Sequence, residues 1–327
     1  MSFQDQQVLV TGATGFLGGT LALKLASLGA KVRALVRTPE KAGFLPPEVE
    51  RFHGDVTDAD AMRRACAGCS VVFHAAASFT DMPSQIAINV EGTRTVMLAA
   101  GEARVERIVH VSSIAVYGSA YPYDVTEEMR LAPGAMPYAI TKARAEAIVH
   151  EVGGRCGLSY TIIRPGMIYG RRGALWTDAL FKLARLNPTP FVGDGSGSAF
   201  PIHVDDVVDF MLVAAQHPNA HNEAFHCTPD PSVTWREFVG SYSRLAGHDN
   251  WLPIPPPLVF GAAGIAQLLS PRDGVGREAP DAVQFLRRFI TFKMSKARDL
   301  LGWQPKIDLP TGIALTADYL REAGLLT

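Results

Sequence analysis

Thr11-Gly12-Ala13-Thr14-Gly15-Phe16-Leu17-Gly18 decides the fold of this chain, because it joins a short apolar run to a helical pattern. Residues 8–10 before it are typical of a buried strand, and leucines at 17, 21, 25 and 28 follow helical spacing. Gly12 would permit a tight turn, Gly15 would let a pyrophosphate approach the backbone, and Gly18 would let the helix pack closely. The free amides at the helix start would face the phosphates. The octet therefore predicts a dinucleotide-binding strand–turn–helix unit.

Apolar strand-like runs alternate with helical stretches over the first two-thirds of the chain. Strands are expected at 7–11, 31–36, 50–54, 70–75, 106–111 and 159–164. Helices are expected at 15–28, 58–67, 83–103 and 138–153. This alternation predicts an α/β fold, a Rossmann-type doubly wound parallel sheet with right-handed crossovers. Such a sheet binds ligands beyond the carboxyl ends of its strands, where the glycine turn would lie.

A second informative stretch, Tyr138-Ala-Ile-Thr-Lys142, opens one of the expected helices. Residues four apart lie on the same helix face, so the Lys142 ammonium is expected to lower the pKa of the Tyr138 phenol toward the range useful in acid/base catalysis. Ser113, at the end of an earlier strand, could hydrogen-bond a substrate oxygen. Tyr-x-x-x-Lys alone recurs by chance in many helices. Its occurrence in this order, after the glycine turn, favours a catalytic set of Ser113, Tyr138 and Lys142.

Together these pieces resemble the extended (atypical) short-chain dehydrogenase/reductase family, of the NAD-dependent epimerase/dehydratase type. The matching segments run nearly from end to end of the chain. They are TGATGFLG at 11–18, HGDVTD at 53–58, HAAA at 74–77, NVEGT at 89–93, VSSIAVYG at 111–118, YAITK at 138–142, RPGMIYG at 164–170, IHVDDV at 202–207 and FKMSKARDLLGWQPK at 292–306. The set is highly specific for the family and much less specific for any member's substrate.

The resemblance implies a dinucleotide-binding Rossmann domain over residues 1–165 and a smaller C-terminal α/β substrate domain over 166–327. Segments at about 200–230 are expected to return to the first domain. Later helices are expected near 174–186, 205–217, 234–246, 258–269, 279–289 and 309–322. Residues 250–271 carry no charged side chain, and helix 258–269 is shorter than the roughly twenty residues that span a bilayer. A buried or lid-like helix is expected there, with a membrane-surface contact as the alternative.

The end of the second expected strand bears on the choice of nicotinamide cofactor. NAD-preferring relatives carry an acidic residue there that binds the ribose hydroxyls, whereas this chain has Val36 followed by Arg37. Arg37 could pair bidentately with a 2′-phosphate, and Lys41 could assist it. NADP is therefore favoured; NAD stays open as the alternative, as does a purely surface role for Arg37.

The resemblance implies further cofactor contacts at the strand ends. Asp55 would hold the adenine amine and Val56 the ring face, although Asp55 could also cap the next helix. Pro165 would lie against the nicotinamide, and Lys142 would bond its ribose. The full expected cofactor set is Gly12, Thr14, Gly15, Phe16, Leu17, Gly18, Arg37, Asp55, Val56, Ala75, Ala76, Ala77, Tyr138, Lys142 and Pro165. Structural support is expected from Asn89, Tyr117 and Arg164.

Two positions depart from the sugar-nucleotide members of the family. Met167 stands where those enzymes usually carry an Asn, and Ala199 stands where they carry an Arg that grips a diphosphate. The expected substrate residues are Ser113, Met167, Ala199 and Phe200. The departure favours the flavonol-reductase and hydroxysteroid-dehydrogenase-like branch. Charge could still come from Arg171, Arg172 and Lys182.

The leading interpretation is an NADP(H)-dependent oxidoreductase that reduces a carbonyl, or oxidises an alcohol, of a mainly apolar small molecule. One alternative is a nucleotide-sugar epimerase or dehydratase with tightly bound NAD(P). A second is a non-catalytic cofactor-sensing relative, against which the intact Ser113, Tyr138 and Lys142 argue. The resemblance also allows a homodimer, in which helices 83–103 and 138–153 would form a four-helix contact.

Composition excludes several other classes of function. The 327 residues are 47% hydrophobic and 19% charged with a net charge of −1, so no nucleic-acid partner is expected. The polar N-terminus and the four cysteines suit a reducing cytoplasm, and no membrane span is expected. Cys66 and Cys69 lack a second ligand pair, so neither redox nor zinc chemistry is expected. Asp205 and Asp206 after His203 are read as capping a helix, and no metal site is expected.

Overall fold

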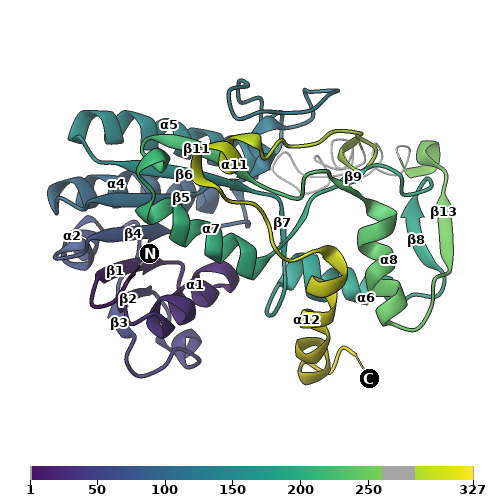
Figure 1. The fold of residues 1–327 in the computed structure, drawn as a ribbon, viewed down its shortest axis with the longest axis horizontal. Coiled ribbons are helices and arrows are strands. Elements are labelled where there is room, and N and C mark those ends of the chain that lie inside the picture. The colour runs from purple at the N-terminus through teal and green to yellow at the C-terminus, as the bar shows by residue number, and fades with distance from the viewer. Residues whose placement is uncertain (1, 260–283, 327) are drawn as a thin grey trace.

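The computed structural model describes residues 2–259 and 284–326. A seven-stranded, wholly parallel sheet with the strand order β11-β6-β5-β4-β1-β2-β3 forms its larger lobe, at the left of Figure 1. Its strands are β1 (Gln7–Thr11), β2 (Lys31–Val36), β3 (Glu50–His53), β4 (Val71–His74), β5 (Arg107–Val111), β6 (Tyr160–Pro165) and β11 (Glu223–Cys227). The first six agree with the sequence prediction to within one residue at each end. The Rossmann-type fold is thereby confirmed.

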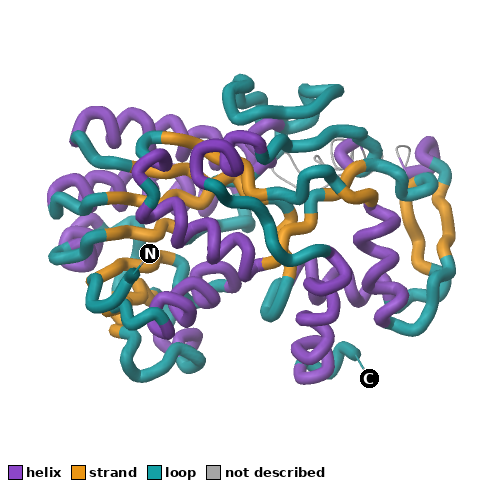
Figure 2. The backbone as a smooth tube through the Cα atoms, in the orientation of Figure 1, coloured by secondary structure: helices purple, strands orange, loops and turns teal. Residues whose placement is uncertain are grey.

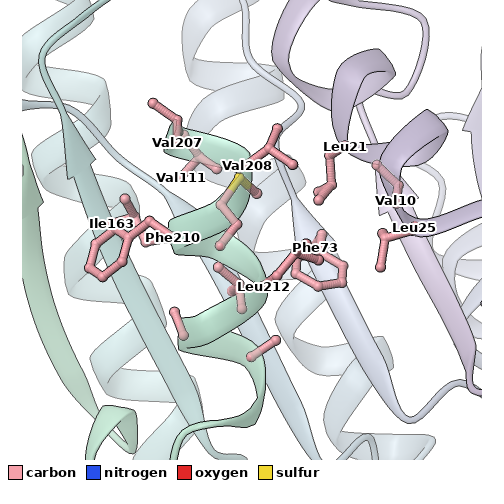
Figure 3. Packing of buried hydrophobic residues seen from close by; sticks show 14 of the residues in the cluster. Val10, Leu21, Leu25, Phe73, Val111, Ile163, Val207, Val208, Phe210 and Leu212 are labelled. Atoms are coloured by element: carbon pink, nitrogen blue, oxygen red, sulfur yellow. The ribbon is translucent and has the colours of Figure 1, made fainter. Parts of the chain in front are cut away.

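Helices cover both faces of the sheet, as the purple and orange segments of Figure 2 show. On one face, α1 (Phe16–Ser27) packs beside α7 (Val204–Gln216). Figure 3 shows Leu21 and Leu25 of α1 on the side of Val208 and Phe73, while Phe210 of α7 lies beside Ile163. The other face carries α2 (Ala59–Cys66), α4 (Gly92–Glu102) and α5 (Pro137–Cys156) over a separate apolar cluster. Burial of these two clusters stabilises the sheet, in which the carboxyl ends of the parallel strands all lie at one edge.

The helix expected over residues 83–103 is interrupted. It consists of α3 (Met82–Gln85), a π-helical segment η2 (Ile86–Glu91) and α4. The π turn contains Asn89, which is buried and bonded to residues outside the helix. Single π turns of this kind cluster at functional sites, and apolar spacing alone does not reveal them.

A smaller lobe, at the right of Figure 1, contains the short elements of the second half. Among the described residues, its helices include η4 (Ala174–Ala179), α6 (Leu180–Ala184), α8 (Trp235–Leu245) and α12 (Leu309–Glu322). Its strands are β7 (Met167–Tyr169), β8 (Thr189–Val192), β9 (Ser198–Ala199), β10 (Pro201–His203), β12 (Val233–Thr234) and β13 (Trp251–Ile254). The sequence did not predict these strands, because runs of two to four residues carry no readable period.

The chain returns to the larger lobe twice after β6. First α7 packs on the sheet and β11 pairs with β6, with Phe225 opposite Ile163. Then the segment around α11 (Ser295–Leu301) places Met294, Leu301 and Trp303 in the same apolar cluster as α1 and α7. The Trp303 ring stacks on Phe210, with ring centroids 4.2 Å apart. The larger lobe is therefore assembled from three separate parts of the chain.

Residues 260–269 of the helix expected at 258–269 and residues 279–283 of that expected at 279–289 lie outside the described residues. Over the described ranges, no helix combines the length and the apolar character needed to cross a membrane. Two short 3-10 helices, η1 (Pro39–Ala42) and η5 (Pro218–Ala220), link larger-lobe elements, and a third, η3 (Ile114–Tyr117), follows β5.

Candidate active site

The glycine turn after β1 brings the chain closer to itself than any side chain would allow. Gly12 has a φ of +70°, and a Cβ there would lie 2.8 Å from the backbone of Ala75 and Ala76. A Cβ on Gly18 would lie 2.4 Å from the Gly12 carbonyl oxygen. Helix α1 then begins at Phe16, with Gly15 as its N-cap, no capping side chain and no acidic residue in its first turn. These features fit the diphosphate of a dinucleotide, which would accept hydrogen bonds from the helix start.

Arg37 and Asp55 lie together where β2 and β3 end. The Arg37 Nη1 is 3.5 Å from the Asp55 Oδ2, and 66% of the Arg37 side chain is exposed. Asp55 also accepts hydrogen bonds from the Thr57 amide and hydroxyl, while Asp58 rather than Asp55 caps α2. The pKa of Asp55 is lowered: burial opposes the shift, but the bonds from Thr57 and the Arg37 charge outweigh it. Arg37 thus remains accessible to a phosphate beside an ionised carboxylate.

The other expected cofactor residues line the same edge of the sheet. Ala75, Ala76 and Ala77 follow β4 directly, and the Ala76 amide donates to the Thr11 hydroxyl over 3.2 Å. Pro165 ends β6, and Val56 is buried against Gly92. The structure therefore gathers the expected cofactor residues around the carboxyl ends of the strands, as a doubly wound sheet requires.

Ser113, Tyr138 and Lys142 converge beside these strand ends. Ser113 begins the 3-10 turn η3, where its hydroxyl accepts from the Ala115 amide over 3.1 Å. Its side chain also hydrogen-bonds the Tyr138 phenol. Tyr138 and Lys142 project from the first turns of α5, and the Lys142 Nζ donates to the Val111 carbonyl at the end of β5 over 2.5 Å.

The pKa values of this trio correct one expectation. Burial raises the pKa of Tyr138 to about 12, with the hydrogen bond from Ser113 opposing the shift. Burial also lowers the pKa of Lys142 to about 8, while the nearby Glu146 carboxylate opposes that shift. The expectation that Lys142 lowers the Tyr138 pKa is wrong for this structure, because desolvation dominates. Tyr138 is a neutral phenol at pH 7 and can donate its proton to an oxygen that gains negative charge.

A buried ionic network lies behind the trio and was only partly anticipated. Arg164 forms a bidentate pair with Glu146, at 3.0 Å and 2.7 Å, and both side chains are at most 5% exposed. Ser112 donates to Glu146, and Arg164 also donates to the Tyr117 hydroxyl and the Glu127 carbonyl. Glu146 follows Lys142 by four residues on the same face of α5, so its helical spacing was the signal that could have found it.

Three of the expected substrate residues are buried in this structure. Met167, Ala199 and Phe200 are 3%, 0% and 0% exposed, and they belong to the apolar core of the smaller lobe. Phe200 packs edge-on against Phe292, with ring centroids 4.9 Å apart. These three residues are therefore core residues rather than an open surface. The sequence could not show that the distant Phe292 packs against Phe200.

Three basic residues that could still supply charge, Arg171, Arg172 and Lys182, follow β7 in the chain. Arg171 is exposed and pairs with Glu322, and Lys182 is exposed. Arg172 does not point to solvent: its guanidinium lies 3.6 Å from the centroid of the Phe44 ring and donates to the Thr14 carbonyl over 3.4 Å. It thus fastens the loop after β7 to the glycine turn.

Two motifs set aside from the sequence have structural roles. Cys66 and Cys69 are free and buried, and burial raises the pKa of the Cys66 thiol to about 12. His203, rather than an aspartate, caps α7 by accepting from the Asp205 amide, while Asp206 accepts from the amides of Lys306 and Ile307. No group of three or more His, Cys, Asp or Glu side chains in residues 2–259 and 284–326 is arranged to hold a metal ion.

One residue of the site escaped the sequence analysis altogether. Phe79 is 71% exposed, and its ring stacks on that of Tyr138, with centroids 4.7 Å apart and an angle of 26° between the planes. It comes two residues after Ala77, in the loop that leaves β4. An aromatic side chain directly after an expected cofactor segment was the available signal.

Comparison with known proteins places this geometry in a family context. Residues 8–227 match the family described as the NAD dependent epimerase/dehydratase family. Over 97% of its length the chain is 31% identical to a 4-hydroxy-2-methyl-3-oxo-4-farnesyl-3,4-dihydroquinoline-1-oxide ketoreductase of Stigmatella aurantiaca, covering 96% of that protein. It is 30% identical to a UDP-glucose 4-epimerase of Mycolicibacterium smegmatis, with 96% of this chain and 98% of that protein aligned.

A solved structure gives the same context in three dimensions. MoeE5 in complex with UDP-glucuronic acid and NAD superposes with a TM-score of 0.75 at 27% identity, covering 97% of this chain and 99% of that one. Its fold extends over both lobes described above. The chain is thus similar both to a ketoreductase and to sugar-nucleotide proteins, and the solved structure among them contains NAD.

Proposed function

The chain belongs to the NAD-dependent epimerase/dehydratase family of extended short-chain dehydrogenases/reductases, and from that premise we propose that it reduces the carbonyl group of a mainly apolar small molecule with NADPH. The reverse reaction, oxidation of the corresponding alcohol, uses the same residues. The cofactor, when bound, supplies or accepts the hydride. The protein's own residues supply the proton and position the reacting carbonyl.

The observation that carries this proposal is the convergence of Ser113, Tyr138 and Lys142 beside the glycine turn. The neutral Tyr138 phenol donates its proton to the substrate oxygen as the carbonyl is reduced. The Ser113 hydroxyl, already bonded to that phenol, orients the same oxygen. The Lys142 ammonium, held by the Val111 carbonyl, stabilises the phenolate that forms.

Several features support a substrate without a diphosphate. Ala199 and Met167, at the positions where sugar-nucleotide relatives carry polar anchors, are buried among apolar side chains. Of the nearby basic residues, Arg171 is already paired with Glu322 and Arg172 is stacked on Phe44. A diphosphate without a cationic partner would be costly to desolvate, whereas an apolar framework gains about 25 cal/mol per Å² buried. The similarity to a ketoreductase of a farnesylated quinoline agrees with this class.

A ligand panel tests the substrate class directly. Aromatic and alicyclic ketones and aldehydes are expected to oxidise NADPH in the presence of the protein, followed by nicotinamide absorbance. Uridine- and thymidine-diphospho-sugars are expected to give no binding heat in calorimetry with the cofactor-loaded protein. Micromolar binding of any nucleotide sugar would instead favour the epimerase function of the Mycolicibacterium smegmatis relative.

The preference for NADP rests on Arg37, which follows the apolar end of β2 and is largely exposed. Arg37→Asp is expected to shift binding from NADPH toward NADH, because it replaces a phosphate partner with an acceptor for ribose hydroxyls. Fluorescence titration of both cofactors into both proteins measures the shift. Arg171→Asp, which alters an arginine at similar exposure away from β2, is the matched control. A wild type that binds NADH more tightly than NADPH would overturn the preference.

A further inference from the structure

Phe79 holds an unusual position for an apolar side chain. It is among the most exposed large hydrophobic residues in the described chain, at 71%, and yet its ring stacks on the candidate proton donor Tyr138. An exposed phenylalanine gains little for stability, because most of its surface remains in water. The stacked arrangement, with centroids 4.7 Å apart, falls within the separation that interacting aromatic pairs adopt. Phe79 therefore presents an aromatic ring to the space beside the reacting phenol.

The loop that carries Phe79 is fixed on both sides. The Ser78 amide donates to the Asn89 Oδ1 over 2.7 Å, and the Asn89 Nδ2 donates back to the Ser78 carbonyl over 3.0 Å. On the other side, the Gln85 Nε2 donates to the Thr80 carbonyl over 2.8 Å. A backbone held by buried amides on either side does not drift as a surface loop would.

The same network joins this loop to the helix that carries Tyr138. The Thr141 hydroxyl accepts from the Asn89 Nδ2 over 3.1 Å and bonds to the Gln85 Oε1 over 3.3 Å. Thr141 lies three residues after Tyr138, and its side chain also bonds to the Tyr138 carbonyl. The π turn η2 supplies Asn89 to this arrangement. Asn89 and Gln85 bond both to the loop of Phe79 and to Thr141, so they hold Phe79 and Tyr138 in a fixed relative position.

The position of Phe79 relative to the Tyr138 hydroxyl determines which part of a substrate can contact Phe79. The substrate oxygen must come within about 2.6–3.2 Å of the Tyr138 hydroxyl for proton transfer. Because the Phe79 ring stacks on the phenol with centroids 4.7 Å apart, a substituent of the carbonyl that extends toward Phe79 meets the exposed part of its ring. We propose that Phe79 is a specificity-determining residue that binds a flat, unsaturated or aromatic group attached directly to the reacting carbonyl. This inference rests on the proposed carbonyl reduction and narrows its substrate class to aryl or conjugated carbonyl compounds.

The test compares two ketones that differ in saturation, acetophenone and cyclohexyl methyl ketone, as substrates of the full chain with NADPH. The ratio of their kcat/KM values is expected to fall by about 3- to 10-fold in Phe79→Ala, the scale of one aromatic pair, and mainly through KM. Phe79→Tyr, which keeps the ring, should retain the wild-type ratio. Tyr123→Ala, which removes another exposed aromatic ring away from Tyr138, is the control and should leave the ratio unchanged.

An unchanged ratio in Phe79→Ala would overturn the inference. So would an equal loss of kcat with both ketones, since that is the signature of a ring that only shields Tyr138. If wild type reduces neither ketone, the proposed function fails instead. The inference is then decided by calorimetry of benzamide and cyclohexanecarboxamide with the NADP-loaded protein, where Phe79→Ala must still reduce the preference for the aromatic amide.

Discussion

Replacing Tyr138 with Phe is expected to lower turnover by roughly 10²-fold or more while leaving cofactor affinity nearly unchanged. The substitution removes only the hydroxyl that donates the proton, and the ring stacked on Phe79 remains. Ser113 and Lys142 also stay in place, because the Lys142 amine bonds to the Val111 carbonyl rather than to the phenol. Initial rates with NADPH and a ketone that the wild type reduces measure the loss, and fluorescence titration measures cofactor binding.

The pH dependence gives an independent check on the same hydroxyl. Burial holds the Tyr138 pKa at about 12, so in alcohol oxidation the phenolate base becomes more populated as pH rises, and the rate should rise with it. Tyr138→Phe should lose that rise. Tyr121→Phe removes a surface hydroxyl that donates to the Arg130 carbonyl, and it should change neither the rate nor the profile. Wild-type turnover by Tyr138→Phe would exclude this tyrosine as the proton donor.

Replacing Arg164 with Met is expected to lower the free energy of unfolding by about 3–5 kcal/mol, because it leaves the buried Glu146 carboxylate without its partner. Glu146 is 1% exposed and has Arg164 as its only ion-pair partner in the described residues. The variant also leaves the Tyr117 hydroxyl and the Glu127 carbonyl without their guanidinium donor. Urea denaturation followed by tryptophan fluorescence measures the loss as a lower midpoint.

Two further variants separate the stranded charge from other effects. The double variant Arg164→Met, Glu146→Met should recover much of the lost stability, since removal of both charges leaves none unpaired. Glu151 lies on the same helix as Glu146 and forms exposed pairs with Arg94 of α4 and with Arg155. Glu151→Gln removes these pairs and should leave the midpoint unchanged. A double variant no more stable than Arg164→Met alone would contradict the assignment to the buried charge.

The larger lobe was predictable because its signals are local. The glycine turn, the apolar runs of β1, β2 and β4, and the helical spacing of α1 and α5 each lie within about twenty residues of sequence. Tyr138 and Lys142 were found for the same reason, since one helical turn separates them. By contrast, no local pattern marks the break at η2, where tertiary bonds to Asn89 sustain a π turn.

The features of the site that the sequence could not predict depend on contacts between distant segments. Phe200 was expected to face a ligand, but its buried ring packs against Phe292, some ninety residues further on. The pKa of Tyr138 could not be predicted for the same reason. The sequence showed Lys142 four residues away, but the burial that raises the pKa is a property of the folded chain. Phe79 was missed because its importance lies in its contact with a helix about sixty residues away.

The late return of β11 and the α11 segment has a consequence for the order of events during synthesis on the ribosome. When residue 165 has emerged, β6 is the edge of the sheet, and its unpaired backbone is a template for pairing with another chain. That edge is covered only after residue 227 emerges, and Trp303 reaches Phe210 later still. A nascent chain stalled between these points therefore exposes a parallel strand edge and the apolar surface that α7 will cover. Such partly made chains are the species most prone to aggregate. A chaperone would therefore bind the nascent chain while the β6 edge is still uncovered.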